Sequence, residues 1–226
     1  MSTVIAILTR SPADPRIKTR LTSVLPSDQA RRELALAFID DQVESAGRVA
    51  GVALRIAVTP PAEGLRMSRP QFVGEMFLGQ RGASSADRQK NVLMDLSRSG
   101  FTNIVMMGSD LPDLPSDVLE KAARTLESDP SAVVLGPSHD GGYYLLGLHI
   151  GADPVPDLFS TLRFSTPREV DDMEAAVTRA GRTLLRLATW RDVDVAEDLT
   201  ALTDRLRATP GAAPHTTAVL RRLGLF

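Results

Sequence analysis

Short apolar runs alternate with segments of helical periodicity along most of the chain. The apolar runs predict buried strands at residues 4–8, 52–58, 103–107, 132–135, 143–148 and 183–187. Helical spacing of apolar residues predicts helices at residues 28–45, 85–98, 116–128, 167–180 and 195–207. Strands that alternate with helices form a sheet that is parallel at its centre and covered on both faces. The pattern therefore predicts an α/β fold, a three-layer α/β/α sandwich with a mostly parallel central sheet.

The length of 226 residues suits one ordinary domain. We find neither an internal repeat nor a linker, so we expect residues 1–226 to form a single domain. An Ala/Pro/Thr-rich stretch at residues 208–217 precedes an apolar end at residues 218–226. We expect this end to pack either on the domain or on a second copy of the chain, which would form a homodimer.

The amino-acid composition limits the kinds of partner and active site that the chain can have. Apolar residues make up 43% and charged residues 24%, as is typical of soluble globular proteins. The net charge of -2 argues against a nucleic-acid partner, because phosphate-backbone binding requires a basic surface. The sequence contains no cysteine, and its three histidines are widely spaced, which excludes thiolate chemistry and the HExxH zinc motif. Any metal ion is therefore expected on oxygen ligands.

The N-terminal residues show no signal-peptide pattern. No apolar run approaches the roughly 18 residues that a membrane-spanning helix needs. We therefore expect a cytoplasmic protein without a membrane span.

The loop after the first predicted strand is rich in cations. It contains Arg10, Arg16, Lys18 and Arg20. Open α/β sheets bind ligands at the carboxyl ends of their strands, so this loop is a candidate site for a di- or triphosphate. Arginine would contribute bidentate contacts and lysine a point charge. A solvated basic surface explains the same pattern.

Carboxylates directly follow the third predicted strand. The strand ends at Gly108, and Asp110 and Asp113 come next. Mg²⁺ is bound in proteins by one or two carboxylates, with water and ligand phosphates completing its shell. Asp110, opposite the basic loop, is therefore a candidate metal ligand. Alternatively, these aspartates organise a turn and the next helix start, and this is the interpretation we favour for Asp113.

A glycine pair marks the loop between the fourth and fifth predicted strands. Gly141 and Gly142 allow a ligand to approach the backbone closely, and Asp140 beside them offers a carboxylate for catalysis. The preceding residues do not complete the G-x-S-x-G elbow of hydrolases. Adjacent Ser138, His139 and Asp140 also cannot converge as a catalytic triad. We interpret His139 as an exposed loop residue.

The last candidate segment precedes the helix expected at residues 195–207. Asp194 is predicted to cap this helix, and Glu197 is predicted to close a capping box three residues later. A capping aspartate keeps one oxygen free, and this oxygen of Asp194 can complete a metal site that Asp110 begins. Neither the P-loop motif nor the G-x-G-x-x-G motif occurs, which argues against kinase-like and NAD-dependent activities.

Four motifs, taken in order, resemble those of the nucleotide-diphospho-sugar transferase superfamily. They are Lys18-Thr19-Arg20-Leu21; Gly108-Ser109-Asp110-Leu111-Pro112-Asp113-Leu114; Val134-Leu135-Gly136-Pro137 with Asp140-Gly141-Gly142-Tyr143-Tyr144-Leu145-Leu146-Gly147-Leu148; and Asp192-Val193-Asp194 with Glu197-Asp198-Leu199. The resemblance is closest to a small bacterial glycosyltransferase-like family of unknown substrate, the DUF2064-like proteins. It is more distant to the phospholactate guanylyltransferases, whose sequence continues differently after the glycines.

This resemblance implies a GT-A fold and assigns roles to several residues. Lys18 and Arg20 would contact the donor phosphates, Asp110 would be the metal-binding aspartate, and Asp194 would be a second metal ligand. We expect Arg10, Gly141 and Gly142 to contact the donor and Asp140 to act with Asp110 in catalysis. The nucleotidyltransferase relatives have a glycine-rich turn before the lysine, whereas this loop has Pro12, Asp14 and Pro15. Side chains are therefore expected to replace backbone N–H groups in holding the phosphates.

The leading hypothesis is a transferase dependent on Mg²⁺ or Mn²⁺ that moves a sugar from a nucleotide-sugar donor to a small acceptor. One alternative is nucleotidyl transfer from an NTP with release of pyrophosphate. The other is a noncatalytic nucleotide-binding domain that retains the fold.

Overall fold

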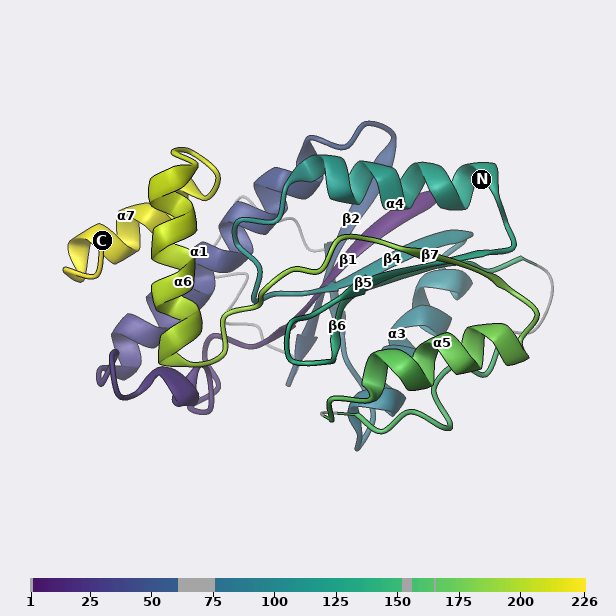
Figure 1. Ribbon diagram of the computed structural model, residues 1–226, viewed down its shortest axis with the longest axis horizontal. Helices are drawn as coiled ribbons and strands as arrows, with labels where there is room; N and C mark the ends of the chain where they lie inside the picture. The colour runs from purple at the N-terminus through teal and green to yellow at the C-terminus, as the bar shows by residue number, and fades with distance from the viewer. Residues whose placement is uncertain (1, 61–75, 152–155, 165) are drawn as a thin grey trace.

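The computed structural model describes residues 2–60, 76–151, 156–164 and 166–226 (Figure 1). Its strands are β1 Thr3–Arg10, β2 Val52–Thr59, β3 Phe77–Gly79, β4 Asn103–Gly108, β5 Ala132–Pro137, β6 Tyr143–His149 and β7 Thr183–Arg186. Its helices are η1 Thr19–Leu21, α1 Asp28–Gly47, α3 Ser85–Arg98, α4 Ser116–Ser128, α5 Glu169–Arg179, α6 Ala196–Ala208 and α7 Pro214–Arg222. All six expected strands and all five expected helices are present, and β3, η1 and α7 add to them.

The strands form one sheet in the order β3-β2-β1-β4-β6-β5-β7. Strand β1 pairs in parallel with both β2 and β4, whereas β6 is antiparallel to its neighbours β4 and β5. Strand β7 continues in parallel beyond β5. The carboxyl ends of β1, β4 and β5 therefore lie at one edge of the sheet. The three candidate loops meet at this edge, as expected for an open α/β sheet.

Alternate residues of the central strands pack into different layers. Val4 and Ala6 of β1 lie in the core that α3 and α5 complete. Ile5 and Ile7 point the other way, into the core shared with α4 and the end of α1. Figure 1 shows α4 above the sheet and α3 and α5 below it. The predicted three-layer α/β/α sandwich with a mostly parallel sheet is thus confirmed.

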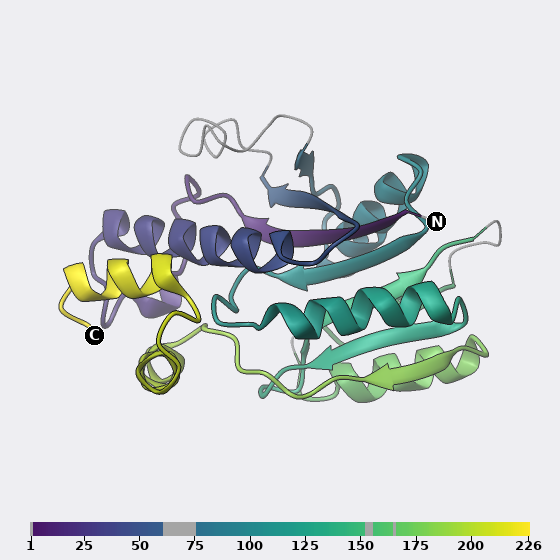
Figure 2. The ribbon, with the colours of Figure 1, turned by 90° about the horizontal axis from the view of Figure 1, so that it is seen from above.

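Helices α6 and α7 extend the fold beyond the carboxyl edge of the sheet (Figures 1 and 2). Leu202 and Leu206 of α6 and Leu220 of α7 share a buried cluster with Leu34 and Phe38 of α1. The apolar C-terminal segment therefore packs on its own chain, which was one of the two expected arrangements. None of the described helices is long and apolar enough to cross a membrane.

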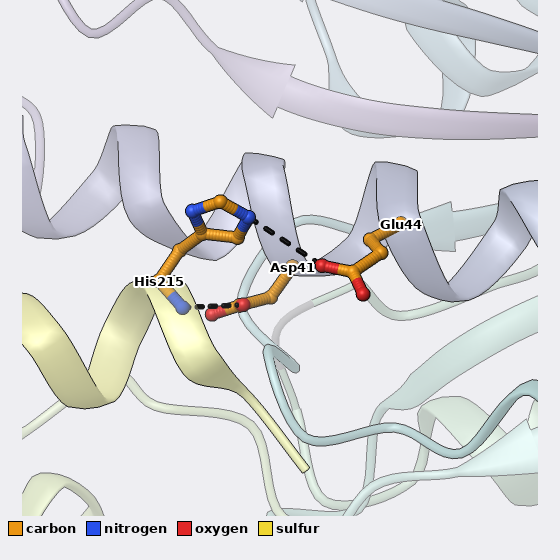
Figure 3. A group of neighbouring side chains, drawn as sticks. All are labelled: Asp41, Glu44 and His215. Carbon is orange, nitrogen blue, oxygen red and sulfur yellow. Dashed lines mark hydrogen bonds and ion pairs between the residues drawn. The ribbon is translucent and has the colours of Figure 1, made fainter. Parts of the chain in front are cut away.

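The start of α7 is fastened to α1 by one carboxylate. Asp41 lies on α1 and accepts the backbone N–H of His215 at 2.9 Å (Figure 3). It also accepts the backbone N–H of Thr216 at 2.8 Å. Glu44 lies 3.5 Å from the His215 Nε2. These three side chains could offer ligand atoms within 4.8 Å of one another. However, the positive end of the helix dipole disfavours a cation there. We therefore assign Asp41 a capping role.

Substitution of Asp41 tests this role. Asp41→Ala should lower the free energy of unfolding by about 1–3 kcal/mol, because two N–H groups lose a buried acceptor. Glu44→Ala is the matched control and should cost less than about 1 kcal/mol, since its pair with His215 is half exposed. Urea unfolding would measure both. Equal losses for the two variants would contradict the capping role.

Candidate active site at the carboxyl edge of the sheet

A cavity of about 420 Å³ opens at the carboxyl edge of the sheet. Four segments line it: the loop after β1, the end of β4, the start of β6 and the segment between β7 and α6. The lining residues are Leu8, Arg10, Arg16, Ile17, Lys18, Thr19, Arg20, Gly108, Ser109, Asp110, Leu111, Tyr143, Tyr144, Asp192 and Asp194. Five residues expected from the sequence are among them, namely Arg10, Lys18, Arg20, Asp110 and Asp194.

Lys18 contacts residues from several of the segments that line the cavity. Its ammonium is 2.7 Å from Asp110 Oδ1 and donates a hydrogen bond to the Val193 carbonyl, also at 2.7 Å. It lies 5.0 Å from the centre of the Phe38 ring, and the side chain is only 5% exposed. The backbone of Lys18 is left-handed, with φ 49°. This conformation costs a non-glycine residue roughly 1 kcal/mol or more, which the side-chain contacts offset.

Asp110 follows the end of β4 and joins it to the segment before α6. Its backbone carbonyl accepts the N–H of Val193 at 2.9 Å, and its Oδ1 accepts the Ser109 hydroxyl at 3.1 Å. The Asp110 side chain is 34% exposed, so it can still contact a ligand. This strand-end position is the one that the sequence analysis predicted.

The alternation Asp192-Val193-Asp194 turns two carboxylates towards the cavity. Val193 is fully buried, and the residues on either side of it both line the cavity. Burial and the charges of Asp194, Asp140 and Asp110 raise the pKa of Asp192 to about 6. Burial and the charge of Asp110 also raise the pKa of Asp194. Asp192 belongs to the fourth sequence motif but was assigned no role there, although its period-two spacing with Asp194 is a signal for a shared face.

The predicted cap of α6 is wrong by one residue. Asp194 does not cap the helix, because the extended residue Val195 precedes its first turn. The carboxylate of Asp198, rather than that of Glu197, accepts the N–H groups of Asp194, at 3.1 Å, and Val195, at 3.0 Å. The Asp194 carboxylate instead contacts Arg20 Nη1 at 3.2 Å. It is thus held at the cavity and not at the helix start.

Asp14 organises the glycine-free loop after β1. Its buried carboxylate accepts Arg10 Nη1 at 2.9 Å, and Arg16 Nε and Nη2 at 3.1 and 2.9 Å. The hydrogen bonds from Arg16 hold the pKa of Asp14 well below its usual range. Both guanidinium groups line the cavity. A buried carboxylate and two arginines therefore organise this loop, as expected for phosphate contacts made by side chains.

The turn between β5 and β6 lies beside the cavity. Asp140 Oδ1 accepts the N–H of Gly142 at 2.9 Å, and Gly141 has φ +91°. A Cβ on Gly141 would lie 2.5 Å from Pro167 Cα, so the turn itself requires a glycine. None of these three turn residues is among the described residues that line the cavity. Contacts of Gly141 and Gly142 with a donor, and catalysis by Asp140, remain predictions.

Asp113 pairs with side chains that are far from it in the sequence. Its buried carboxylate accepts Arg205 Nε of α6 at 2.6 Å and the Trp190 Nε1 at 3.3 Å. Trp190 in turn donates its backbone N–H to Pro137 at 3.0 Å. Asp113 thus fastens α6 and the segment before it to the sheet, rather than starting α4. His139 is exposed, as expected.

Capping of α6 by Asp198 can be tested by substitution. Asp198→Ala should lower the free energy of unfolding by about 1 kcal/mol, because two N–H groups at the start of α6 lose their acceptor. Asp194→Ala should leave this cap intact and cost less. Urea unfolding of the two variants would compare them. A larger loss for Asp194→Ala than for Asp198→Ala would restore Asp194 as the cap.

The raised pKa of Asp192 predicts how stability depends on pH without metal. Between the unfolded value of 3.8 and the folded value of about 6, the folded protein binds the extra proton. The free energy of unfolding therefore falls as pH rises through this window. Asp192→Asn should remove that fall and stabilise the protein at about pH 8 but little at about pH 4. Urea unfolding in EDTA would test this. The same gain at both pH values would contradict it.

Comparisons with known proteins identify the family and the fold of the chain. Residues 42–166 match the family DUF2064, described as an uncharacterized protein conserved in bacteria. No curated protein matches the chain. A structure from Desulfovibrio desulfuricans G20, provisionally assigned as a nucleotide-diphospho-sugar transferase, is 28% identical with a TM-score of 0.86. The match covers 98% of this chain and 95% of that one.

Two more distant structures share the fold. CMP:2-keto-3-deoxy-manno-octonic acid synthetase, complexed with CTP, is 18% identical with a TM-score of 0.55, over 92% of this chain and 98% of that one. A cytidylyltransferase from Leptospira borgpetersenii serovar Hardjo-bovis is 14% identical with a TM-score of 0.57, over 99% and 94%. The chain therefore belongs to the DUF2064 family and has the fold of the nucleotide-diphospho-sugar transferase superfamily.

Proposed function

We propose that this protein is a metal-dependent transferase that moves the glycosyl group of a nucleotide-sugar to a small acceptor. The proposal rests on one observation: positively charged and negatively charged side chains line the same cavity. Arginine and lysine side chains follow β1, and carboxylates follow β4 and β7. A diphosphate bound to a divalent cation complements both sets, because the cations contact its oxygens and the carboxylates contact its metal.

The three carboxylates in the cavity suit Mg²⁺ or Mn²⁺. Asp110, Asp192 and Asp194 offer only oxygen ligands, which these hard cations prefer. Burial, and after it the charges of Asp194, Asp140 and Asp110, raise the pKa of Asp192, and a cation beside these carboxylates would favour their charged form. Asp110 and Asp194 would hold the ion. When bound, it would neutralise charge on the diphosphate.

The proposed reaction transfers the glycosyl group to a hydroxyl of the acceptor. An acceptor hydroxyl oxygen bonds to the anomeric carbon while the bond from that carbon to the diphosphate oxygen breaks, and the nucleoside diphosphate leaves. Lys18 and Arg20 stabilise the negative charge that develops on the leaving diphosphate. Asp140 is our candidate to receive the hydroxyl proton, because it is exposed at the β5–β6 turn and its charge reaches Asp192.

Nucleotidyl transfer is the second candidate. In that reaction a substrate phosphate oxygen bonds to the α-phosphorus of an NTP, and pyrophosphate leaves. The matches to a CTP-bound synthetase and a cytidylyltransferase, which extend over nearly the whole chain, favour it. The same cations would stabilise the leaving pyrophosphate.

One assay separates the two reactions. The protein is incubated with Mg²⁺, a panel of small acceptors, and either NTPs or nucleotide-sugars. Release of nucleoside diphosphate from a nucleotide-sugar supports glycosyl transfer, and release of pyrophosphate from an NTP supports nucleotidyl transfer. Metal-dependent nucleotide binding without turnover would instead indicate a noncatalytic binding domain.

Asp110→Asn tests the metal assignment. The amide has no negative charge for a hard cation, so turnover should fall by roughly 10²-fold or more while the fold stays intact. Asp117→Asn on the exposed side of α4 is the matched control and should retain parental turnover. Unchanged turnover and unchanged metal dependence in Asp110→Asn would remove Asp110 from the site.

A further inference from the structure

The ammonium of Lys18 lies against one of the carboxylates that we assign to the divalent cation. It is 2.7 Å from Asp110 Oδ1, and Asp194 lines the same cavity. The side chain is 5% exposed and also donates to the Val193 carbonyl. Lys18 therefore supplies a buried positive charge to the same carboxylates that we assign to the divalent cation.

Lys18 and a divalent cation cannot both contact Asp110 Oδ1 without strong repulsion. The ammonium already occupies hydrogen-bonding distance of that oxygen, and two like charges a few ångströms apart in a partly buried site repel strongly. A cation that binds the protein alone must therefore displace the lysine or bind more weakly.

A nucleoside diphosphate changes this balance. Its phosphate oxygens offer the Lys18 ammonium a new partner, and lysine reaches it by rotation of its flexible stem. Movement of Lys18 to the phosphate frees Asp110 Oδ1 for the cation. The cation in turn contacts the same phosphates.

We propose that the Lys18 ammonium takes the place of the divalent cation in the nucleotide-free protein, so that nucleoside diphosphate and cation strengthen each other's binding. Lys18 is then a positioning residue that makes the metal site conditional on the donor. The nucleotide half of this inference rests on the proposed function, whereas the competition between lysine and cation does not. Linkage requires the coupling to be equal in both directions.

The first experiment uses Mn²⁺ alone and follows its binding by electron paramagnetic resonance. Lys18→Met should bind Mn²⁺ more tightly than the parent by about 5- to 150-fold, which is the usual range of coupling between sites. Lys18→Arg keeps the positive charge and should show no gain. Adding Asp110→Asn to Lys18→Met should abolish the gain. Lys121→Met on the exposed surface of α4 is the matched control and should behave as the parent.

The second experiment adds a panel of nucleoside diphosphates, titrated with and without Mn²⁺. In the parent the two ligands should strengthen each other, and in Lys18→Met this coupling should shrink. Equal Mn²⁺ affinity of the parent and folded Lys18→Met would overturn the inference. Failure of the parent to bind any nucleoside diphosphate would overturn the proposed function instead, while the Mn²⁺ comparison still decides the lysine–cation competition.

A measurement on the parent protein covers the case in which Lys18→Met does not fold. The chain has three lysines, Lys18, Lys90 and Lys121, so nitrogen resonances of their side chains are simple to assign. Mg²⁺ should move the Lys18 signal at a much lower concentration when a nucleoside diphosphate is present than when it is absent. Movement at the same Mg²⁺ concentration with and without nucleotide, or no movement when both are bound, would contradict the inference.

Discussion

The ion pair between Lys18 and Asp110 holds the candidate site together. With the hydrogen bond from Lys18 to the Val193 carbonyl, it joins the loop after β1, the end of β4 and the segment before α6. These segments are far apart in the sequence and have little regular structure at this point. Their positions depend on a few buried polar contacts, because an unpaired charge here would be costly. The ion pair that sets the geometry also places a positive charge beside the Asp110 carboxylate.

The sheet makes this arrangement possible. Strand β1 lies between β2 and β4 in parallel, so the loops after β1 and β4 leave the same edge. The antiparallel strand β6 places the β5–β6 turn at that edge as well. Burial, and after it the charges of neighbouring carboxylates, raise the pKa values of Asp192 and Asp194 at this edge. Carboxylates with raised pKa values are typical of functional sites.

The sequence predicted the layers but not the contacts between loops. Apolar periodicity located six of the strands and five of the helices, because burial against a neighbouring layer imposes it. Helix α7 was expected only as part of an apolar end, and the short strand β3 and the helix η1 carry too few residues for a periodic signal. The cap of α6 was assigned one residue early, since the extended conformation of Val195 is not visible in the sequence. Strand-end position identified Asp110, whereas the pairing of Asp113 with Arg205 joins residues far apart in the sequence and depends on tertiary structure.

The proposed function and the further inference require one cavity to bind a nucleoside diphosphate through Lys18 and its divalent cation through Asp110. A crystal structure of the protein with Mn²⁺ and a nucleoside diphosphate tests this requirement most directly, because anomalous scattering locates the manganese. We predict manganese beside Asp110 and Asp194, with the Lys18 ammonium on a phosphate oxygen and no longer in contact with Asp110. Manganese at another position, or an intact Lys18–Asp110 pair beside the bound nucleotide, would contradict this account.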